Sequence, residues 1–334
     1  MKIGVIGATG FTGEKLIEIL LTHPEAELVY LSARVDKKVK LSGAFPKFKK
    51  KTGLFLEKLN LEKAEASADL FFLALPHTVS FKIAPFFIKK GKTVIDLSAD
   101  YRFKDAGLYK KFYKTAHKDK KNLPKAVYGL PEFYREDIKK SKLIANPGCY
   151  PTVSILSCAP LLREKVIKDI IIDAKSGITG AGRKPSLNFH FAHLSGNMYA
   201  YKLFSHQHQP EIERILSDLA GRGNRLIFTP HVIPAERGIL ITVYAGLLKR
   251  ISKKDIIRIY SSYYRHEKFV RILKNRMPQL KDVADTNFCD IGFEVKGDKI
   301  IISSAIDNLM KGASGQAVQN MNIILGVKED TGLK

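Results

Sequence analysis

Residues 2–13, with the sequence KIGVIGATGFTG, decide the fold of this 334-residue chain. The apolar run 2–6 predicts a buried strand, and the glycine-rich turn after it leads into an apolar helical pattern over 14–21. In such a turn glycine lets the backbone approach a pyrophosphate, and the amide groups of the helix start donate to it. The spacing G-x-x-G-x-x-G departs from the more familiar G-x-G-x-x-G, but its place directly after a strand predicts a dinucleotide-binding turn. The candidate cofactor ligands here are Gly7, Ala8, Thr9, Gly10, Phe11, Thr12 and Gly13.

The loop after the second predicted strand, residues 28–31, indicates which dinucleotide is bound. An NAD enzyme often carries an acidic residue there, which binds the 2′-hydroxyl of the ribose. This chain instead has Ser32 and Arg34. A hydroxyl beside a guanidinium suits a 2′-phosphate, because arginine is a charged, bidentate donor. NADP is therefore predicted, with NAD as the alternative because Asp36 lies nearby.

Two further predicted strands, 69–75 and 93–97, end in polar loops. In parallel α/β sheets the loops at the carboxyl ends of the strands line the ligand crevice. His77 in the first loop is predicted to contact the cofactor rather than to carry a proton. Arg102 in the second loop is a candidate ligand for a substrate phosphate, and a structural ion pair is the alternative.

A cysteine lies at the start of another predicted helix, within Asn146-Pro147-Gly148-Cys149-Tyr150-Pro151-Thr152. The apolar run 153–162 predicts the helix. Aligned peptide dipoles place a partial positive charge at a helix start, which lowers the pKa of a nearby thiol and favours the nucleophilic thiolate. Cys149 is therefore a candidate nucleophile, and a small buried hydrophobic residue is the alternative for any lone cysteine.

Two segments after the cysteine are candidates for the same site. A predicted strand, 170–175, runs into the loop 176–185, whose glycines, hydroxyls and basic residues favour a site over a linker. His206 and His208 precede a helix with Pro210 in its first turn. They could be general bases, metal ligands or ordinary loop residues, and a metal is not expected because no third ligand has a suitable spacing. A histidine beside a reactive cysteine would supply acid-base chemistry.

The rest of the chain predicts a second region of helices and strands. Two strands within 225–248 and a helix over 255–266 are followed by strands 292–296 and 300–305, which pair around a Gly297-Asp298 turn. A final helix follows residue 313. The alternation of strands and helices over this length indicates an α/β protein with two domains.

The composition indicates a folded protein with a basic surface. Three cysteines are too few and too scattered for a disulfide framework, so a cytoplasmic location is expected. No apolar run approaches the roughly 20 residues of a membrane span, so no membrane partner is expected. The net charge of +23 raises nucleic acid as a partner. The lysines recur along the chain without a nucleic-acid-binding module, which favours a solvated surface, and no nucleic-acid partner is expected. A milder functional gain would be attraction of an anionic substrate and cofactor.

A series of long motifs resembles the N-acetyl-gamma-glutamyl-phosphate reductases, an NADP-dependent family of arginine biosynthesis related to aspartate-semialdehyde dehydrogenase. The motifs occur in the family's order and extend over almost the whole chain. They are GATGFTG at 7–13, FLALPH at 72–77, VIDLSADYR at 94–102, YGLPE at 128–132, NPGCYPT at 146–152, SGITGAGR at 176–183, HQHQPEI at 206–212, TPHVIPAERGIL at 229–240 and DNLMKGASGQAVQNMN at 307–322.

The resemblance implies an N-terminal Rossmann domain with a mostly parallel sheet, residues 1–148 joined by a C-terminal helix over 313–334. It implies a second, α+β domain with a mixed sheet, residues 149–312, which makes subunit contacts in a homodimer or homotetramer. It also implies Cys149 as the nucleophile, which takes the acyl group of an acyl phosphate as a thioester that NADPH then reduces. His208, or alternatively His206, would be the acid-base group.

The resemblance assigns binding residues as well. Besides the glycine turn, Ser32 and Arg34, the implied cofactor contacts are Pro76, His77, Ser98, Gly177 and Asn308. The implied substrate contacts are Arg102, Asn146, Arg183 and Arg237. Gln207 departs from the family, since relatives commonly have arginine there, and this removes a cation beside the histidines.

Two alternatives remain open. A related reductase acts on a carrier-protein-linked aminoadipyl or glutamyl phosphate, and an acidic carrier would suit a basic protein. Asn146, Tyr150 and the Pro210-Glu211 pair favour the free N-acetyl substrate. The non-enzymatic alternative is a nucleotide-sensing or RNA-binding protein on the same fold, and the complete set of Cys149 and two histidines argues against it.

Overall fold

The computed structural model describes residues 1–183 and 190–334, which form two compact units. The first unit contains residues 1–147 together with 313–333, and the second contains residues 148–312 with the terminal Lys334. Lys184 and Pro185, which end the predicted active-site loop, lie outside the described residues.

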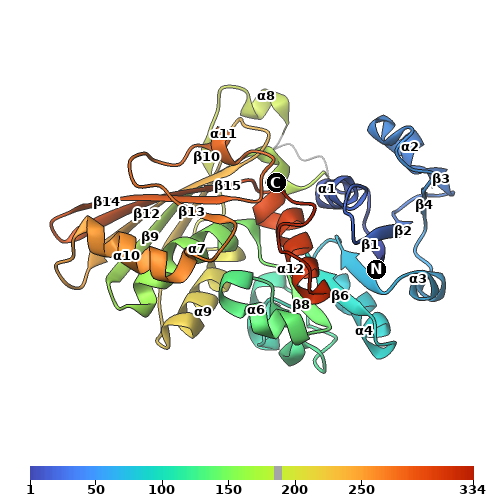
Figure 1. Cartoon of the computed structure of the whole chain (residues 1–334), viewed down its shortest axis with the longest axis horizontal. Helices are drawn as coiled ribbons and strands as arrows, with labels where there is room; N and C mark the ends of the chain where they lie inside the picture. The colour runs from blue at the N-terminus through green and yellow to red at the C-terminus, as the bar shows by residue number, and fades with distance from the viewer. Residues whose placement is uncertain (184–189) are drawn as a thin grey trace. The chain divides into compact units, whose positions relative to one another are not determined.

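The first unit is built on an eight-stranded sheet with the order β3-β4-β2-β1-β5-β6-β8-β7 (Figure 1). The paired strands are parallel, apart from β3 with β4. This confirms the predicted mostly parallel sheet. The strands are β1 (Lys2–Ile6), β2 (Glu27–Ser32), β3 (Val39–Lys40), β4 (Phe55–Glu57), β5 (Leu70–Leu73), β6 (Thr93–Asp96), β7 (Val127–Tyr128) and β8 (Leu143–Ala145).

Helices pack against this sheet through large aromatic residues. Every residue of β5 is buried, as is typical of a parallel strand covered on both faces. Phe71 of β5 stacks on Phe87 of α4 with ring centroids 3.9 Å apart. A side chain at Gly4 of β1 would lie 2.6 Å from the Phe71 ring, so this strand needs glycine there. The helices are α1 (Phe11–Leu20), α2 (Leu41–Ala44), α3 (Leu61–Ser67), α4 (Ser80–Lys89), α5 (Ala106–Tyr113), α6 (Pro131–Lys140) and α12 (Gly315–Leu325).

The C-terminal segment returns to the first unit, but the predicted helix over 313–334 is too long. A short π-helix, Met310–Ser314, precedes α12, and α12 ends at Leu325. Gly326 follows it in the left-handed conformation, φ +71°, which is the usual way for glycine to end a helix. Asn320 of α12 donates to the Gly129 carbonyl and to Asn146 Oδ1, at 2.9 and 3.1 Å, which ties the helix to the end of β8.

The second unit is built on a seven-stranded sheet with the order β10-β11-β9-β12-β15-β14-β13. The pairs β9 with β11 and β13 with β14 are parallel and the other pairs are antiparallel, which confirms the predicted mixed sheet. The predicted pairing around Gly297-Asp298 is also confirmed, as the antiparallel pair β14 and β15. The strands are β9 (Ile167–Ser176), β10 (Tyr199–Ala200), β11 (Leu226–Val232), β12 (Ile239–Leu247), β13 (Val270–Ile272), β14 (Cys289–Lys296) and β15 (Lys299–Ile306).

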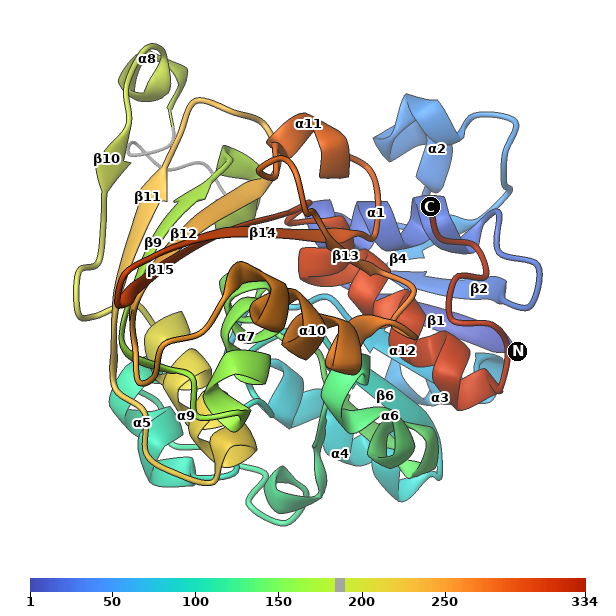
Figure 2. The same cartoon turned by 60° about the vertical axis from the view of Figure 1, so that its left-hand side comes forward.

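The helix α7 packs against one face of this sheet, and α9 and α10 pack against α7 (Figure 2). Within α7, Pro160 has no N–H to donate to the carbonyl of Leu156, one turn earlier. The buried Tyr264 hydroxyl donates to that carbonyl at 2.7 Å, so the missing backbone bond is replaced from α10. The helices of this unit are α7 (Cys149–Arg163), α8 (Phe191–Leu194), α9 (His208–Ala220), α10 (Lys253–Tyr264) and α11 (Leu280–Val283).

The opposite face of the sheet carries a row of exposed apolar side chains. Ile171, Ile227, Tyr244 and Ile301 are 40–45% exposed. Ile171 pairs with both Ile227 and Tyr244, and Tyr244 pairs with Ile301, so the four lie side by side on neighbouring strands. Exposed apolar side chains that adjoin one another in this way are candidates for an interaction surface.

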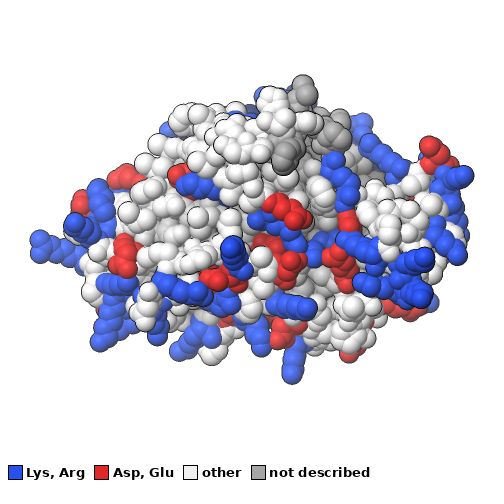
Figure 3. Space-filling model, turned by 90° about the horizontal axis from the view of Figure 1, so that it is seen from above, with Lys and Arg blue, Asp and Glu red and all other residues white. Residues whose placement is uncertain are grey.

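The charged residues are spread over the surface. On the face shown in Figure 3, lysines and arginines occur with Asp and Glu side chains between them. Among the described residues, no helix is both long and apolar enough to cross a membrane.

Candidate active site

Cys149 is the first residue of α7 and is half-buried. The preceding residue, Gly148, is extended, with φ −68° and ψ 154°, and caps the helix. Its N–H donates to Oε1 of Glu211 at 3.0 Å, and its carbonyl accepts from the N–H of Thr152 at 2.9 Å. The start of a 15-residue helix is thus held by a bond from α9, with the thiol at its partially positive end.

The two histidines lie at the start of α9 and differ in environment. His206 is buried, and burial lowers its pKa to about 3, so its ring is neutral at physiological pH. Its Nδ1 accepts the backbone N–H of His208 at 3.1 Å. The ring proton must therefore be on Nε2, which lies 3.4 Å from the Tyr201 hydroxyl. His208 is the first residue of α9, with its ring centroid 4.8 Å from that of His206.

The structure brings Tyr150, the neighbour of Cys149, against both histidines. The Tyr150 ring centroid lies 5.7 Å from that of His206 and 5.8 Å from that of His208. Burial raises the pKa of Tyr150 well above its usual value and that of Tyr201 to about 12, and the charge on Cys149 adds to both shifts. Both phenols therefore stay protonated at neutral pH beside the candidate nucleophile.

The glycine turn of the first unit is shaped by close approach. A side chain at Gly7, where φ is +93°, would lie 2.2 Å from the Ala74 carbonyl oxygen, and one at Gly13 would lie 2.3 Å from the Gly7 carbonyl oxygen. The N–H groups of Gly7 and Ala8 both donate to the Ser32 carbonyl, at 3.0 and 2.9 Å. These two amides therefore join the turn to β2. The turn then leads directly into the start of α1.

The loop after β5 is fastened to the loop after β6 by one buried carboxylate, Asp100. It accepts the N–H of Thr78 at 2.7 Å and that of Phe81 at 3.1 Å, and the hydroxyl of Tyr109 at 2.6 Å. Thr78 has φ +70°, which is strained for a residue with a branched side chain. In the same pair of loops, His77 accepts the N–H of Ala99 through Nδ1 at 3.1 Å.

A second buried carboxylate, Asp96, lies at the end of β6. The N–H and the hydroxyl of Ser98 donate to it at 3.0 and 2.8 Å, and the Ser98 oxygen in turn accepts the N–H of Asp100 at 3.1 Å. Burial and the neighbouring Asp100 raise the pKa of Asp96 to about 7. Ser98, a predicted cofactor contact, therefore bridges two acids.

Arg102 and Asn146, both predicted substrate contacts, are buried and bonded within the first unit. Arg102 donates to the carbonyls of Asn146 and Leu97, at 2.8 and 2.9 Å. The Asn146 amide donates to the Ala313 carbonyl at 3.1 Å and accepts from Asn320. These bonds of Arg102 are to backbone carbonyls, and its role as a ligand for the substrate phosphate stays a prediction.

Three more of the predicted contacts, Gly177, Arg237 and Asn308, lie together in the second unit. Arg237 is paired with Asp285 and with the fully buried Asp307. Asn308 accepts the N–H of Gly238 at 2.7 Å and donates to the Thr179 hydroxyl at 3.0 Å. A side chain at Gly177 would lie 2.8 Å from the backbone nitrogen of Arg237, so the loops at 177–179 and 235–238 are in contact. Arg183 is exposed at the end of the described part of this loop.

Comparison with known proteins gives the family. Residues 2–141 match the semialdehyde dehydrogenase NAD-binding domain, and residues 149–308 match the semialdehyde dehydrogenase dimerisation domain. The whole chain is 47% identical to N-acetyl-gamma-glutamyl-phosphate reductase of Desulforamulus reducens, covering 98% of that protein, and 46% identical to that of Desulforudis audaxviator, covering 98%. The chain belongs to the N-acetyl-gamma-glutamyl-phosphate reductases. It thereby belongs to the semialdehyde dehydrogenase family and has a dinucleotide-binding domain, as the motifs predicted.

Solved structures of more distant relatives share the fold of this reductase. Aspartate semialdehyde dehydrogenase II of Vibrio cholerae is 17% identical, with a TM-score of 0.73 over 97% of this chain and 98% of that one. The Candida albicans aspartate semialdehyde dehydrogenase, solved with NADP, is 16% identical, with a TM-score of 0.72 over 97% of this chain and 98% of that one. At these identities the likeness shows the fold alone.

Four buried acids within the sequence motifs hold loops or a helix start in place, and the sequence did not predict this role. They are Asp96, Asp100, Glu211 and Asp307. A partial signal exists for the first two, because acids separated by small and hydroxyl residues directly after a strand are typical of a bonded turn. Glu211 is in the first turn of its helix, where a carboxylate is expected to face its own helix start. Instead it bonds the start of α7.

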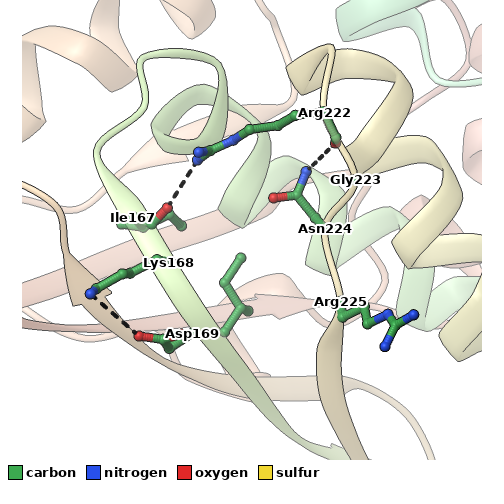
Figure 4. Close-up of a pocket in the computed structure, with 8 residues that line it drawn as sticks. Ile167, Lys168, Asp169, Arg222, Gly223, Asn224 and Arg225 are labelled. Carbon is green, nitrogen blue, oxygen red and sulfur yellow. Dashed lines mark hydrogen bonds and ion pairs between the residues drawn. The ribbon is translucent and has the colours of Figure 1, made fainter.

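A hollow of about 210 Å³ lies elsewhere in the second unit, at the start of β9 and the loop before β11 (Figure 4). Arg222 donates from its guanidinium to the Ile167 carbonyl at 3.4 Å on its wall, and Lys168 and Asp169 pair at 3.9 Å. The residues that line it include no cysteine or histidine, so it is separate from the candidate active site.

Replacing Asp96 tests the buried acid pair. Because the pKa of Asp96 is raised to about 7 in the folded state, from 3.8, the folded protein binds this proton more tightly than the unfolded chain. The stabilisation of the folded state by this proton is complete below pH 3.8 and is lost as the pH rises to about 7. The free energy of unfolding of Asp96→Asn, measured by urea denaturation from pH 5 to 8, should therefore rise relative to wild type with increasing pH. The exposed Asp36→Asn is the control, and a parallel pH dependence in Asp96→Asn would contradict the assignment.

Proposed function

We propose that the protein reduces N-acetyl-gamma-glutamyl phosphate to N-acetylglutamate 5-semialdehyde and phosphate, with NADPH as the reductant. The observation that carries the proposal is the start of α7, where Cys149 is half-buried at the positive end of a helix held by Glu211. The aromatic neighbour Tyr150 connects this helix start to His206 and His208. Full-length relatives with this activity in their names support the substrate.

The chemistry follows from the thiol. The Cys149 thiolate attacks the acyl carbon, a C–S bond forms, and the C–O bond to phosphate breaks with its electron pair leaving on phosphate. NADPH would supply the hydride for the resulting thioester. Collapse of the hemithioacetal then forms the aldehyde carbonyl and returns the thiolate. A thiolate is both a good nucleophile and a good leaving group, so one difficult reduction becomes two easier steps.

The histidine environments support His208 as the acid-base group. The departing phosphate needs a proton, and a positioned histidine can donate it. His206 is a poor donor, because burial keeps its ring neutral and its Nδ1 is occupied by the His208 amide. His206 then positions the first residue of α9, and His208 exchanges the proton.

Three features of the first unit support NADP as the cofactor. A side chain at Gly10, just before α1, would make only an ordinary van der Waals contact, 3.7 Å from the Gly7 carbonyl oxygen. A pyrophosphate can bind the amides of that start. Ser32 is at the end of β2, and Arg34 is exposed just beyond it, as a ligand for a 2′-phosphate would be.

The row of apolar residues Ile171, Ile227, Tyr244 and Ile301 is proposed as the surface at which copies of this chain associate, as a homodimer or homotetramer. Its place within the matched dimerisation domain supports this. Sedimentation equilibrium of the wild type distinguishes a homodimer from a homotetramer, and the charge introduced by Tyr244→Glu should weaken the assembly. An unchanged assembly in Tyr244→Glu would contradict the surface.

The activity is tested by NADPH oxidation with N-acetylglutamyl phosphate and with a carrier-protein-linked aminoadipyl phosphate. Turnover should require the free N-acetyl substrate and should disappear in Cys149→Ala, because that variant lacks the nucleophile. NADP binding, measured by fluorescence titration, should stay near the wild-type value. Preference for the carrier-linked substrate would replace the proposed function, and turnover by Cys149→Ala would exclude the thioester.

Cofactor choice is tested by Arg34→Ala. Loss of a charged donor to the 2′-phosphate should weaken NADP binding about tenfold to a hundredfold and leave NAD binding nearly unchanged, since such a bond contributes roughly 1.5–3 kcal/mol. Isothermal titration of both dinucleotides measures the two affinities. Lys37→Ala, an exposed cation in the same loop, is the matched control. Equal losses for NADP and NAD in Arg34→Ala would contradict the role.

A further inference from the structure

The turn formed by residues 307–312 touches the candidate nucleophile without a side chain between them. A side chain built at Gly312 would place its Cβ 2.8 Å from the Cβ of Cys149, 3.4 Å from the Cα of Cys149 and 3.2 Å from the Asp307 carbonyl oxygen. Real Cβ atoms do not approach other carbon atoms within 3.0 Å. Glycine at 312 is therefore required by this close approach.

Asp307 holds that turn in place from several directions. Its carboxylate is fully buried and accepts the N–H groups of Leu309 and Met310, at 2.8 and 3.1 Å. It also accepts the N–H of Asp285 at 2.8 Å and pairs with the Arg237 guanidinium at 2.9 Å. The Asp307 carbonyl accepts the N–H of Gly312 itself, at 2.9 Å. The backbone of Gly312, which faces Cys149, is thus fixed by hydrogen bonds and an ion pair that extend to the loops containing Asp285 and Arg237.

The local helix type gives a second sign of specialisation. Met310–Ser314 form a single π-helical turn immediately before α12. Such turns are rare and occur often at functional sites, because the wider turn shifts the backbone relative to an α-helix. Here the turn contains the residue that packs against Cys149.

We propose that Gly312 is a positioning residue for Cys149. Because the bare backbone of Gly312 packs directly on the Cβ of Cys149, it fixes the direction in which the sulfur leaves the start of α7. A methyl group at 312 would force either the Asp307 turn or the start of α7 to move. The sulfur would move with it, and displacements of about 1 Å at a reacting atom can reduce rates about a hundredfold.

Gly312→Ala tests the proposal, with Gly53→Ala as the matched control. The two glycines have ordinary φ angles, but a side chain at Gly53 would have no heavy atom within 4 Å. Gly312→Ala should lower kcat about tenfold to a hundredfold with KM changed less than about threefold. The pH-rate profile for alkylation of Cys149 by iodoacetamide should also shift. Wild-type values of kcat and of the alkylation profile in Gly312→Ala would overturn the proposal.

A melting-temperature cycle with Cys149→Gly keeps the test independent of activity and of folding yield. Removing the Cβ at 149 removes the atom that the new methyl group would strike. Gly312→Ala should therefore lower the melting temperature less in the Cys149→Gly background than in wild type. Equal decreases, or failure of both Gly312→Ala and the double variant to fold, would show that contact with Cys149 is not the reason for glycine and would overturn the proposal.

The kcat prediction rests on the proposed reductase function, but the alkylation profile and the melting-temperature cycle do not. A protein that alkylates at Cys149 and shows the coupling, yet does not turn over the acyl phosphate, would contradict the proposed function alone. A protein that turns over normally but shows no coupling would contradict the role of Gly312 alone.

Discussion

The first turn of α7 is the constraint on which the chemistry depends, and it is held from three directions. Glu211 accepts the N–H of Gly148, and the Tyr150 hydroxyl donates to the His231 carbonyl at 3.2 Å. Gly312 packs against Cys149 itself. A helix start would otherwise fray, because its first amides have no partners within the helix. These three contacts hold the backbone that carries the thiol.

In the same unit buried charge holds loops in place. Asp307 and Arg237 form a pair whose acid is fully buried, and removing one partner of such a pair typically costs roughly 3–5 kcal/mol. Asn308, next in sequence, bonds the loops at 179 and 238. These two adjacent residues therefore connect three of the motif segments, 176–183, 229–240 and 307–322. In the first unit Asp96 and Asp100 do the same for the loops after β5 and β6.

Local patterns predicted the fold well, because their causes are local. The glycine turn of 7–13 and the pairing of β14 with β15 depend on neighbouring residues, and both were predicted from short stretches. The end of α12 was also encoded locally, in Gly326, but the predicted helix ran past it. The contacts of the buried carboxylates could not be predicted from local patterns, because Glu211 and Gly148 are 63 residues apart and Arg237 and Asp307 are 70 apart. For the same reason Arg102 and Asn146, predicted as substrate ligands, could not be seen as partners of backbone and amide groups.

The most direct test of the account is a single-turnover experiment without NADPH. If Cys149 takes the acyl group before any hydride is transferred, mixing the enzyme with N-acetylglutamyl phosphate should release about one phosphate per active chain and then stop. Mass spectrometry of the quenched protein should show the acyl group on the peptide that contains Cys149. Release of phosphate only after NADPH is added, or an acyl group on another residue, would contradict the central claim that Cys149 carries the acyl group between phosphate and hydride.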